Sequence, residues 1–264
     1  MSRILGTFAA LKRSGCGGFI PFITAGDPDL ATTELLLREL AAAGADIIEL
    51  GVPFSDPVAD GEVIQRASDR ALRKGVTLRD ALTCIAHVKQ RIDVPIVLFS
   101  YFNPLLRFGE DRLADEAKQA GADAVLVTDL VPEEAQTWTE KLIQHELDPI
   151  FLVAPTTSGD RLAQIAKRGR GFIYAVSRAG VTGARDKITR DAEALVKRVR
   201  AVSDLPVAVG FGVSTADQVR EIWGFADAAV VGSAIVSQIE KLGNSPDLVK
   251  HIGKFARSLV APAS

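Results

Sequence analysis

Short apolar runs alternate with helix-like segments along the chain. Eight runs rich in Val, Ile and Phe have the length of strands. They cover residues 18–23, 46–50, 95–100, 124–128, 149–153, 172–176, 206–209 and 228–231. Between these runs apolar residues recur three or four positions apart, as Leu36, Leu40 and Ala43 do before the second run. The pattern predicts eight strands separated by helices.

This alternation indicates an α/β fold. Near-continuous apolar strands joined by helical crossovers form parallel sheets, and eight such units within about 250 residues are typical of a (β/α)8 TIM barrel. A doubly wound sheet is the alternative, but residues 21–28 (PFITAGDP) lack the Gly-x-Gly-x-x-Gly turn of a dinucleotide fold. No Ser/Gly/Pro-rich linker divides the chain. We therefore expect one barrel domain spanning residues 1–264, with an extra amphipathic helix within residues 1–14.

Composition and charge exclude several classes of protein. Hydrophobic residues make up 47% of the chain and charged residues 24%, values typical of a soluble globular protein. A net charge of −2 gives no basic field for nucleic acid or anionic lipid. Cys16 and Cys84 cannot build a disulfide framework. With no spanning stretch and no signal-peptide pattern, we expect a cytoplasmic chain that binds neither nucleic acid nor membrane.

Two carboxylates stand at the end of the second predicted strand and in the loop after it. The period of two places Glu49 opposite Ile48 and Leu50, which suit the helix-facing side, so Glu49 points into the barrel. An apolar barrel mouth would raise its pKa toward the range of a general acid or base. Asp60 ends a loop rich in Pro, Gly and Asp. The alternatives are a rim carboxylate neutralised by Arg and, for Asp60, a turn or cap residue.

The last three predicted strand ends favour an anion site. The segment 177–186 is long, polar and punctuated by glycine, as a mobile lid would be. Gly212 follows the seventh strand, and Gly232 with Ser233 follows the eighth. Glycines let backbone N–H groups approach an anion, and a helix start adds partial positive charge. These segments predict a phosphate site, tight turns being the alternative.

Other catalytic groups are absent from the predicted strand ends. No lysine lies inside a predicted strand, which argues against a Schiff-base aldolase. The three histidines, His87, His145 and His251, lie in helix-like segments without metal-ligand spacing. A site that makes or breaks carbon–carbon bonds here would need a substrate that holds the electrons itself while carboxylates move the protons.

Several ordered segments match one family. They are 21–28 (PFITAGDP), 46–61 (DIIELGVPFSDPVADG), 154–157 (APTT), 172–183 (FIYAVSRAGVTG), 209–213 (VGFGV) and 230–236 (VVGSAIV). In these the chain resembles the α subunits of tryptophan synthases along nearly its whole length. The resemblance implies a cytoplasmic (β/α)8 lyase of tryptophan biosynthesis that cleaves indole-3-glycerol phosphate into indole and glyceraldehyde 3-phosphate. Glu62 stands where the family usually has Pro; we expect it to be solvated, the alternative being that it raises the pKa of Asp60.

The resemblance also assigns roles to individual residues. Glu49 would shuttle protons, and Asp60 would accept the indole N–H and stabilise the charge that develops on the ring. Thr182, in the lid, would close onto Asp60. The phosphate would lie on Gly183, Gly212, Gly232 and Ser233. The remaining substrate-binding residues would be Phe22, Ile64, Phe99, Leu126, Tyr174 and Phe211.

A partner is expected on the same grounds. No cofactor is expected in this chain. Its product indole would pass to a pyridoxal-phosphate β subunit for condensation with serine to L-tryptophan, in an α2β2 heterotetramer. The segments expected to face that subunit are 53–57, 103–104 and 131–132. The alternatives are a free-standing indole-releasing lyase, a non-catalytic activating subunit, and an isomerase or indole-glycerol-phosphate synthase, although the synthase needs a strand-end lysine that is absent.

Overall fold

The computed structural model describes residues 2–176, 185–210 and 212–261, with residues 185–189 as backbone only. Eight parallel strands close into a barrel in which each strand pairs with the next and β8 pairs with β1. The strands are β1 (Gly18–Thr24), β2 (Ile48–Gly51), β3 (Ile96–Ser100), β4 (Ala124–Val127), β5 (Asp148–Val153), β6 (Ile173–Ala175), β7 (Val207–Gly210) and β8 (Ala228–Val231). The predicted (β/α)8 barrel is confirmed, and each predicted strand overlaps an observed one.

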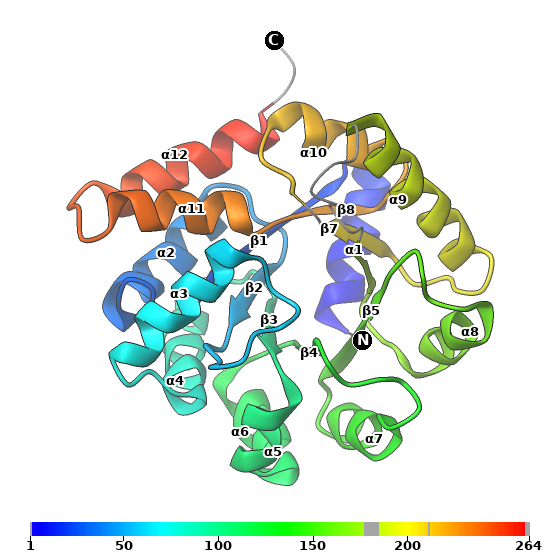
Figure 1. The fold of residues 1–264 in the computed structure, drawn as a ribbon, viewed down its shortest axis with the longest axis horizontal. Helices are drawn as coiled ribbons and strands as arrows, with labels where there is room; N and C mark the ends of the chain where they lie inside the picture. The colour runs from blue at the N-terminus through cyan, green and yellow to red at the C-terminus, as the bar shows by residue number, and fades with distance from the viewer. Residues whose placement is uncertain (1, 177–184, 211, 262–264) are drawn as a thin grey trace.

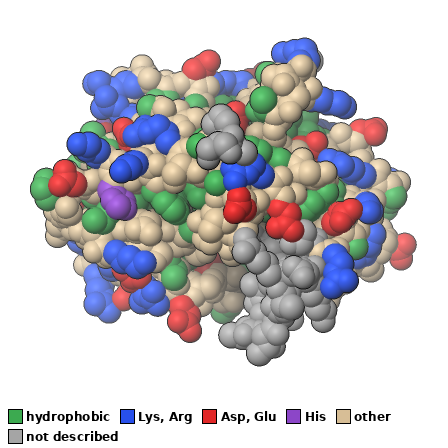
Figure 2. Space-filling view, turned by 90° about the horizontal axis from the view of Figure 1, so that it is seen from above, with side chains coloured by type: hydrophobic (Ala, Val, Ile, Leu, Met, Phe, Trp, Pro, Cys, Tyr) green, Lys and Arg blue, Asp and Glu red, His purple; other side chains and the backbone are tan. Residues whose placement is uncertain are grey.

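Helices surround the barrel (Figure 1). The helices of the described residues, of which α2 to α12 are the outer ones, are α1 (Arg3–Ser14), α2 (Leu30–Ala42), α3 (Glu62–Arg73), α4 (Leu78–Lys89), α5 (Phe102–Phe108), α6 (Glu110–Ala120), α7 (Gln136–Gln144), α8 (Gly159–Arg168), α9 (Arg185–Arg200), α10 (Ala216–Trp223), α11 (Ser233–Leu242) and α12 (Leu248–Val260). No helix in these ranges has both the length and the apolar character needed to cross a membrane. Figure 2 shows acidic and basic side chains interspersed over the face it presents.

The extra N-terminal helix lies inside the ring of outer helices (Figure 1). Its N-cap Ser2 accepts a hydrogen bond from the Leu5 N–H. Ile4 and Phe8 are buried in the cluster that fills the barrel interior. The Phe8 ring lies 5.8 Å from that of Phe172, at the start of β6. Helix α1 therefore contributes apolar side chains to the interior of the barrel.

Side chains of the strands divide between two cores. One set faces outward and packs against the helices, as Ile48 and Leu50 do. The other faces inward and includes Ile47 and Val97. Because side chains alternate along a strand, Glu49 shares the inward side with Ile47. The alternation that buries Ile48 and Leu50 against the helices thus sends a carboxylate into the barrel.

Aspartates at strand entrances hold neighbouring strands in register. The Asp46 N–H donates to the Phe19 carbonyl at 2.9 Å, and the Asp46 carboxylate accepts the Phe19 N–H at 2.8 Å. Asp123 and Asp227 form the same pair of bonds with the first residues of β3 and β7. Each aspartate thus satisfies a backbone donor at the end of the barrel opposite the loop that carries Asp60.

Candidate active site

Glu49 is the most deeply buried of the predicted site residues that can ionise. It lies on β2, in register with Phe22 of β1 and Val97 of β3, and its side chain has no exposed surface. Neither carboxylate oxygen has a hydrogen-bond partner within the described residues. Burial raises the pKa of Glu49 well above its ordinary value of 4.5. A carboxyl group in this state can deliver a proton to a molecule in the barrel mouth.

Asp60 lies in the loop between β2 and α3 and is half-buried. The Tyr101 hydroxyl donates to Asp60 Oδ2 at 3.1 Å and accepts the Ala59 N–H at 2.9 Å. Burial raises the pKa of Asp60 to about 6, and the Tyr101 hydrogen bond opposes that rise. The side-chain amide of Gln65 donates to the Asp60 carbonyl at 2.8 Å. The loop therefore presents an oriented carboxylate that is ionised near neutral pH.

Tyr101 is a site residue that the sequence analysis missed. It follows β3 directly and is 3% exposed. Its ring centroid lies 5.0 Å from that of Phe54, in the loop after β2. A tyrosine immediately after a barrel strand, beside a loop rich in carboxylates, is the signal by which it could have been found.

Three of the predicted apolar pocket residues, Phe22, Ile64 and Phe99, come together at the barrel mouth. Phe22 and Phe99 contact edge to face with ring centroids 5.1 Å apart. Ile64 of α3 packs in the same cluster. A Cβ atom at Gly232 would lie 3.5 Å from Phe22 Cβ and 3.8 Å from Ile64 Cδ1. Leu126, in register with Phe99 on the neighbouring strand, is fully buried in the interior cluster against which Phe99 packs.

Tyr174 lies on β6 and packs against the interior cluster that contains Leu126. Burial raises its pKa well above the ordinary value of 10, and the negative charges of Glu49 and Asp60 raise it further. Its hydroxyl lies over Gly210, where an added Cβ would come within 2.4 Å of the Tyr174 oxygen. The neutral tyrosine can thus offer a hydroxyl to a molecule in the barrel mouth without adding charge.

The predicted anion site is described in part. Ser233 is the first residue of α11, a helix of 10 residues, and Gly232 precedes it at the N-cap. Gly212 is exposed and has a φ of +53°, in the left-handed region that favours glycine. Thr182, Gly183 and Phe211 lie outside the described residues.

Glu62, the first residue of α3, extends its side chain into solvent. Its side chain is 92% exposed and lies 3.9 Å from Arg66. It is not among the groups that shift the pKa of Asp60. The expectation that Glu62 is solvated is confirmed.

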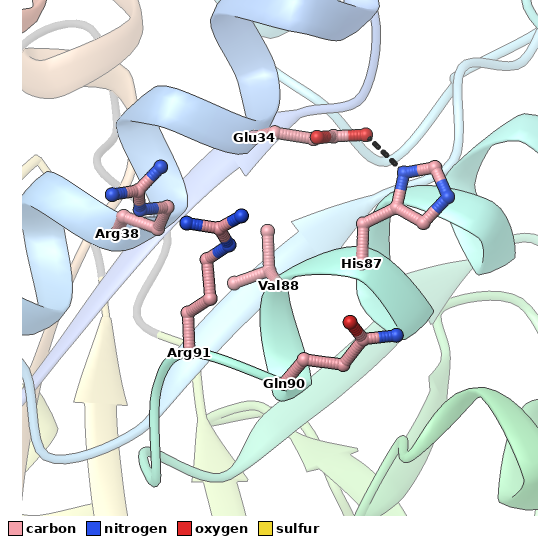
Figure 3. Close-up of a pocket in the computed structure, with 6 residues that line it drawn as sticks. All are labelled: Glu34, Arg38, His87, Val88, Gln90 and Arg91. Carbon is pink, nitrogen blue, oxygen red and sulfur yellow. Dashed lines mark hydrogen bonds and ion pairs between the residues drawn. The ribbon is translucent and has the colours of Figure 1, made fainter.

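A separate surface cavity of about 290 Å³ lies between α2 and α4 (Figure 3). In it the Glu34 carboxylate of α2 meets the His87 ring of α4, with Glu34 Oε1 2.7 Å from His87 Nδ1. The other residues that line it are Arg38, Val88, Gln90 and Arg91. None of these is a predicted site residue. In the described ranges no group of three or more His, Cys, Asp or Glu side chains could hold a metal ion.

Comparisons with known proteins identify the family. The family model described as tryptophan synthase alpha chain matches residues 8–259. The tryptophan synthase alpha chain of Citrifermentans bemidjiense is 50% identical over 259 residues, covering 98% of this chain and 97% of that protein. That of Geobacter sulfurreducens is 48% identical over 259 residues, covering 98% of each chain.

Solved structures agree with the sequence matches. Tryptophan synthase subunit alpha from Legionella pneumophila superposes with a TM-score of 0.92 at 35% identity, covering 98% of this chain and 97% of that chain. A chain of the aminoacrylate-bound form of tryptophan synthase from M. tuberculosis gives a TM-score of 0.87 at 37% identity, with coverage of 98% and 100%. This chain belongs to the tryptophan synthase alpha chain family.

Proposed function

We propose that this chain cleaves indole-3-glycerol phosphate into indole and glyceraldehyde 3-phosphate, as a lyase of tryptophan biosynthesis. The observation that carries the proposal is the presence of two carboxyl groups at one end of the barrel: Glu49 on β2, buried without a hydrogen-bond partner, and Asp60 in the loop after β2, bound by the Tyr101 hydroxyl. Their pKa values are both raised by burial, and both groups act electrostatically on Tyr174. Two carboxyl groups in different protonation states beside one apolar pocket can divide acid and electrostatic roles between them.

The Glu49 carboxyl group transfers the protons. It donates its proton to C3 of the indole ring, which becomes an iminium-like electron sink. The resulting carboxylate accepts the proton of the C3′ hydroxyl. As the aldehyde forms, the C3–C3′ bond breaks and its electron pair returns to the ring, which leaves indole. Glu49 ends the cycle protonated, so no cofactor of this chain is needed.

Asp60 stabilises the charge on the ring during this step. Protonation at C3 places positive charge on the indole nitrogen, and a carboxylate that accepts the N–H opposes that charge. Because the pKa of Asp60 is about 6, the group is ionised at neutral pH. The half-buried position of Asp60 strengthens the interaction relative to water. Tyr101 keeps the carboxylate oriented.

The two ends of the substrate are held by different parts of the barrel. Phe22, Ile64, Phe99 and Leu126 supply the apolar surface for the indole ring. The start of α11, at Gly232 and Ser233, supplies N–H groups and partial positive charge for the phosphate. Thr182, Gly183, Phe211 and Gly212 complete the proposed binding set.

The alpha chain functions with a β subunit. We infer an α2β2 heterotetramer in the cytoplasm, in which the partner uses pyridoxal phosphate to join indole and serine into L-tryptophan. Exposed apolar side chains support a docking face on the catalytic side of the barrel. Val58, Leu106 and Val131 are 84%, 54% and 36% exposed, and they follow β2, β3 and β4, three adjacent strands. The interface would cover these side chains.

Indole release from indole-3-glycerol phosphate tests the proposal. Wild type, Glu49→Gln and Asp60→Asn would each be assayed with and without a pyridoxal-phosphate β subunit. We expect weak wild-type activity that rises with the partner and falls at least about a hundredfold in both variants. High activity that the partner leaves unchanged would indicate a free-standing lyase. Absence of cleavage in both conditions would indicate a non-catalytic subunit.

A further inference from the structure

A network of ion pairs joins three elements that surround the candidate site. Arg70 of α3 donates two hydrogen bonds to the Asp27 carboxylate, from Nε and Nη2, each at 2.8 Å. Its Nη1 donates to Glu240 Oε1 of α11 at 2.6 Å. Arg66, one turn earlier on α3, donates to both oxygens of Glu240 at 2.7 and 2.8 Å. Asp27 lies in the β1–α2 loop and is 2% exposed.

Each joined element carries a different part of the site. Helix α3 begins at Glu62, two residues after Asp60, and packs against β1 and α11. Strand β1 carries Phe22 of the indole pocket. Helix α11 begins at Ser233 of the anion site. Glu240 follows Ser233 by seven residues, about two helical turns, and so lies on the same side of α11.

Arg70 can link the three elements because of its shape. The planar guanidinium presents several N–H donors in a fixed fork, so one side chain can bind two carboxylates at once. The side chain is 30% exposed, whereas Asp27 is almost fully buried. A lysine ammonium is a point charge on a flexible stem and cannot reproduce this geometry.

We propose that Arg70, together with Glu240, is a positioning residue that sets the distance between the indole pocket and the anion site. The proposal rests on the proposed function, in which one substrate spans both places. A ligand with two joined ends gains its full affinity only if both half-sites stand at the matching separation. A ligand that occupies one half-site is indifferent to that separation.

The test compares ligands that occupy only one half-site, here called one-ended, with a ligand that spans both half-sites, here called two-ended. The one-ended ligands are indole and inorganic phosphate. The two-ended ligand is indole bearing a propyl phosphate chain at C3, which cannot be cleaved. Binding of each would be measured for the full chain alone, since the β subunit would itself bind indole, and kcat and KM for indole-3-glycerol phosphate would be measured with the β subunit.

The variants are Arg70→Lys, which keeps the charge beside Asp27, and Glu240→Gln, which loosens α11 without uncovering Asp27. Arg73→Gln is the control. Arg73 lies on the same helix, and its ion pair with Asp69, at 2.7 Å, joins no second element.

We expect both test variants to bind the two-ended ligand roughly ten- to a hundredfold more weakly, with a similar loss of kcat/KM, since small displacements of reacting groups have effects of this size. Indole and phosphate should bind as in wild type, which also shows that the variants are folded. Arg73→Gln should match wild type throughout.

Two outcomes would overturn the proposal. One is an equal loss for one-ended and two-ended ligands, which would show a merely structural role. The other is unchanged two-ended binding. Failure of wild type to cleave the substrate while it binds the two-ended ligand would overturn the proposed function alone, because the binding comparison still tests Arg70.

Discussion

Glu49 and Asp60 are both carboxyl groups at the barrel mouth, but they lie in different environments. Glu49 is enclosed without a hydrogen-bond partner, so burial favours its neutral form. Asp60 is half-buried and accepts a hydrogen bond from the Tyr101 hydroxyl, which favours the ionised form of the carboxyl group. Tyr101 thus separates the protonation states of the two groups, and removing its hydroxyl should bring them closer together.

Tyr101→Phe should shift the pH dependence of cleavage. The hydroxyl lowers the pKa of Asp60, so its loss should raise that pKa above about 6. If the ionised carboxylate is the active form, activity is lost as pH falls through this pKa. The acid limb of kcat/KM against pH should therefore move to higher pH. The Phe ring can keep the contact with Phe54, and an unmoved acid limb would contradict the role given to Tyr101.

Glu49→Gln should stabilise the protein while it removes activity. The unfolded glutamic acid ionises near pH 4.5, whereas burial keeps the folded one neutral to higher pH. Wild-type stability therefore falls as pH rises above 4.5, and the amide is free of this penalty. At pH 8 we expect Glu49→Gln to have a higher Tm than wild type, and at pH 5 we expect the difference to be smaller. Thermal melts at pH 5 and pH 8 would check it, and a gain independent of pH would contradict it.

At the scale of elements, adjacent strands are held in register at one end of the barrel and the site is built at the other. Asp46 fixes β2 against β1 through its two bonds with Phe19. Glu49, three residues later, emerges inside the barrel. In such barrels the catalytic residues lie at the carboxyl ends of the strands, whereas residues at the amino ends contribute to stability. We therefore expect Asp46 to contribute to stability and Glu49 to catalysis, although only three positions separate them.

Asp46→Ala should lower stability without lowering kcat. The substitution leaves the Phe19 N–H without its acceptor, at a cost of about 1–3 kcal/mol in the free energy of unfolding. Asp46→Asn retains an acceptor oxygen and should recover most of that loss. Urea unfolding of both variants and their cleavage rates would be compared with wild type. A large loss of kcat in folded Asp46→Ala would show that the two ends of the barrel are coupled.

The strands could be predicted because their apolar runs are local signals. Residues 46 and 47 were predicted as strand, whereas β2 begins at Ile48, because the carboxylate of Asp46 already serves the neighbouring strand. The position of Tyr101 after a strand is a local signal, but its hydrogen bond with Asp60 could not be predicted, since the two residues lie 41 positions apart and are brought together only by the fold. The same holds for Arg70, whose partners lie 43 and 170 residues away.

At the scale of the whole molecule, elements from the beginning and the end of the sequence pack against each other. Strand β8 pairs with β1 over four residue pairs, and α12 packs against α2. We propose on this basis that residues 1–264 form one domain. The exposed apolar side chains Val58 and Leu106 follow adjacent strands on the side of the barrel that carries Asp60. A partner bound there would contact the loop that positions Asp60.

Val58→Asp should weaken association with the β subunit. Val58 is 84% exposed, so the substitution has little effect on folding, but a charge within an apolar interface is costly. We expect Kd for the β subunit to rise about tenfold, equivalent to about 1.4 kcal/mol. Activity without the partner should stay at the wild-type level. Titration of the β subunit while indole release is followed would measure the effect, and an unchanged midpoint would place the interface elsewhere.

The strand-entrance aspartates divide the barrel into repeated modules. The pairs β1–β2, β3–β4 and β7–β8 each carry one, at Asp46, Asp123 and Asp227. In the pair β5–β6 the Arg170 N–H donates to the Pro149 carbonyl. Because proline has no backbone N–H, no carboxylate is needed there to accept one. A chain cut within α7 would therefore leave two complete strand pairs in each half, whereas a cut between β3 and β4 would separate Asp123 from its partner. We therefore expect two fragments cut within α7 to reassemble more readily than two fragments cut between β3 and β4, because only the first cut keeps these hydrogen bonds within each fragment.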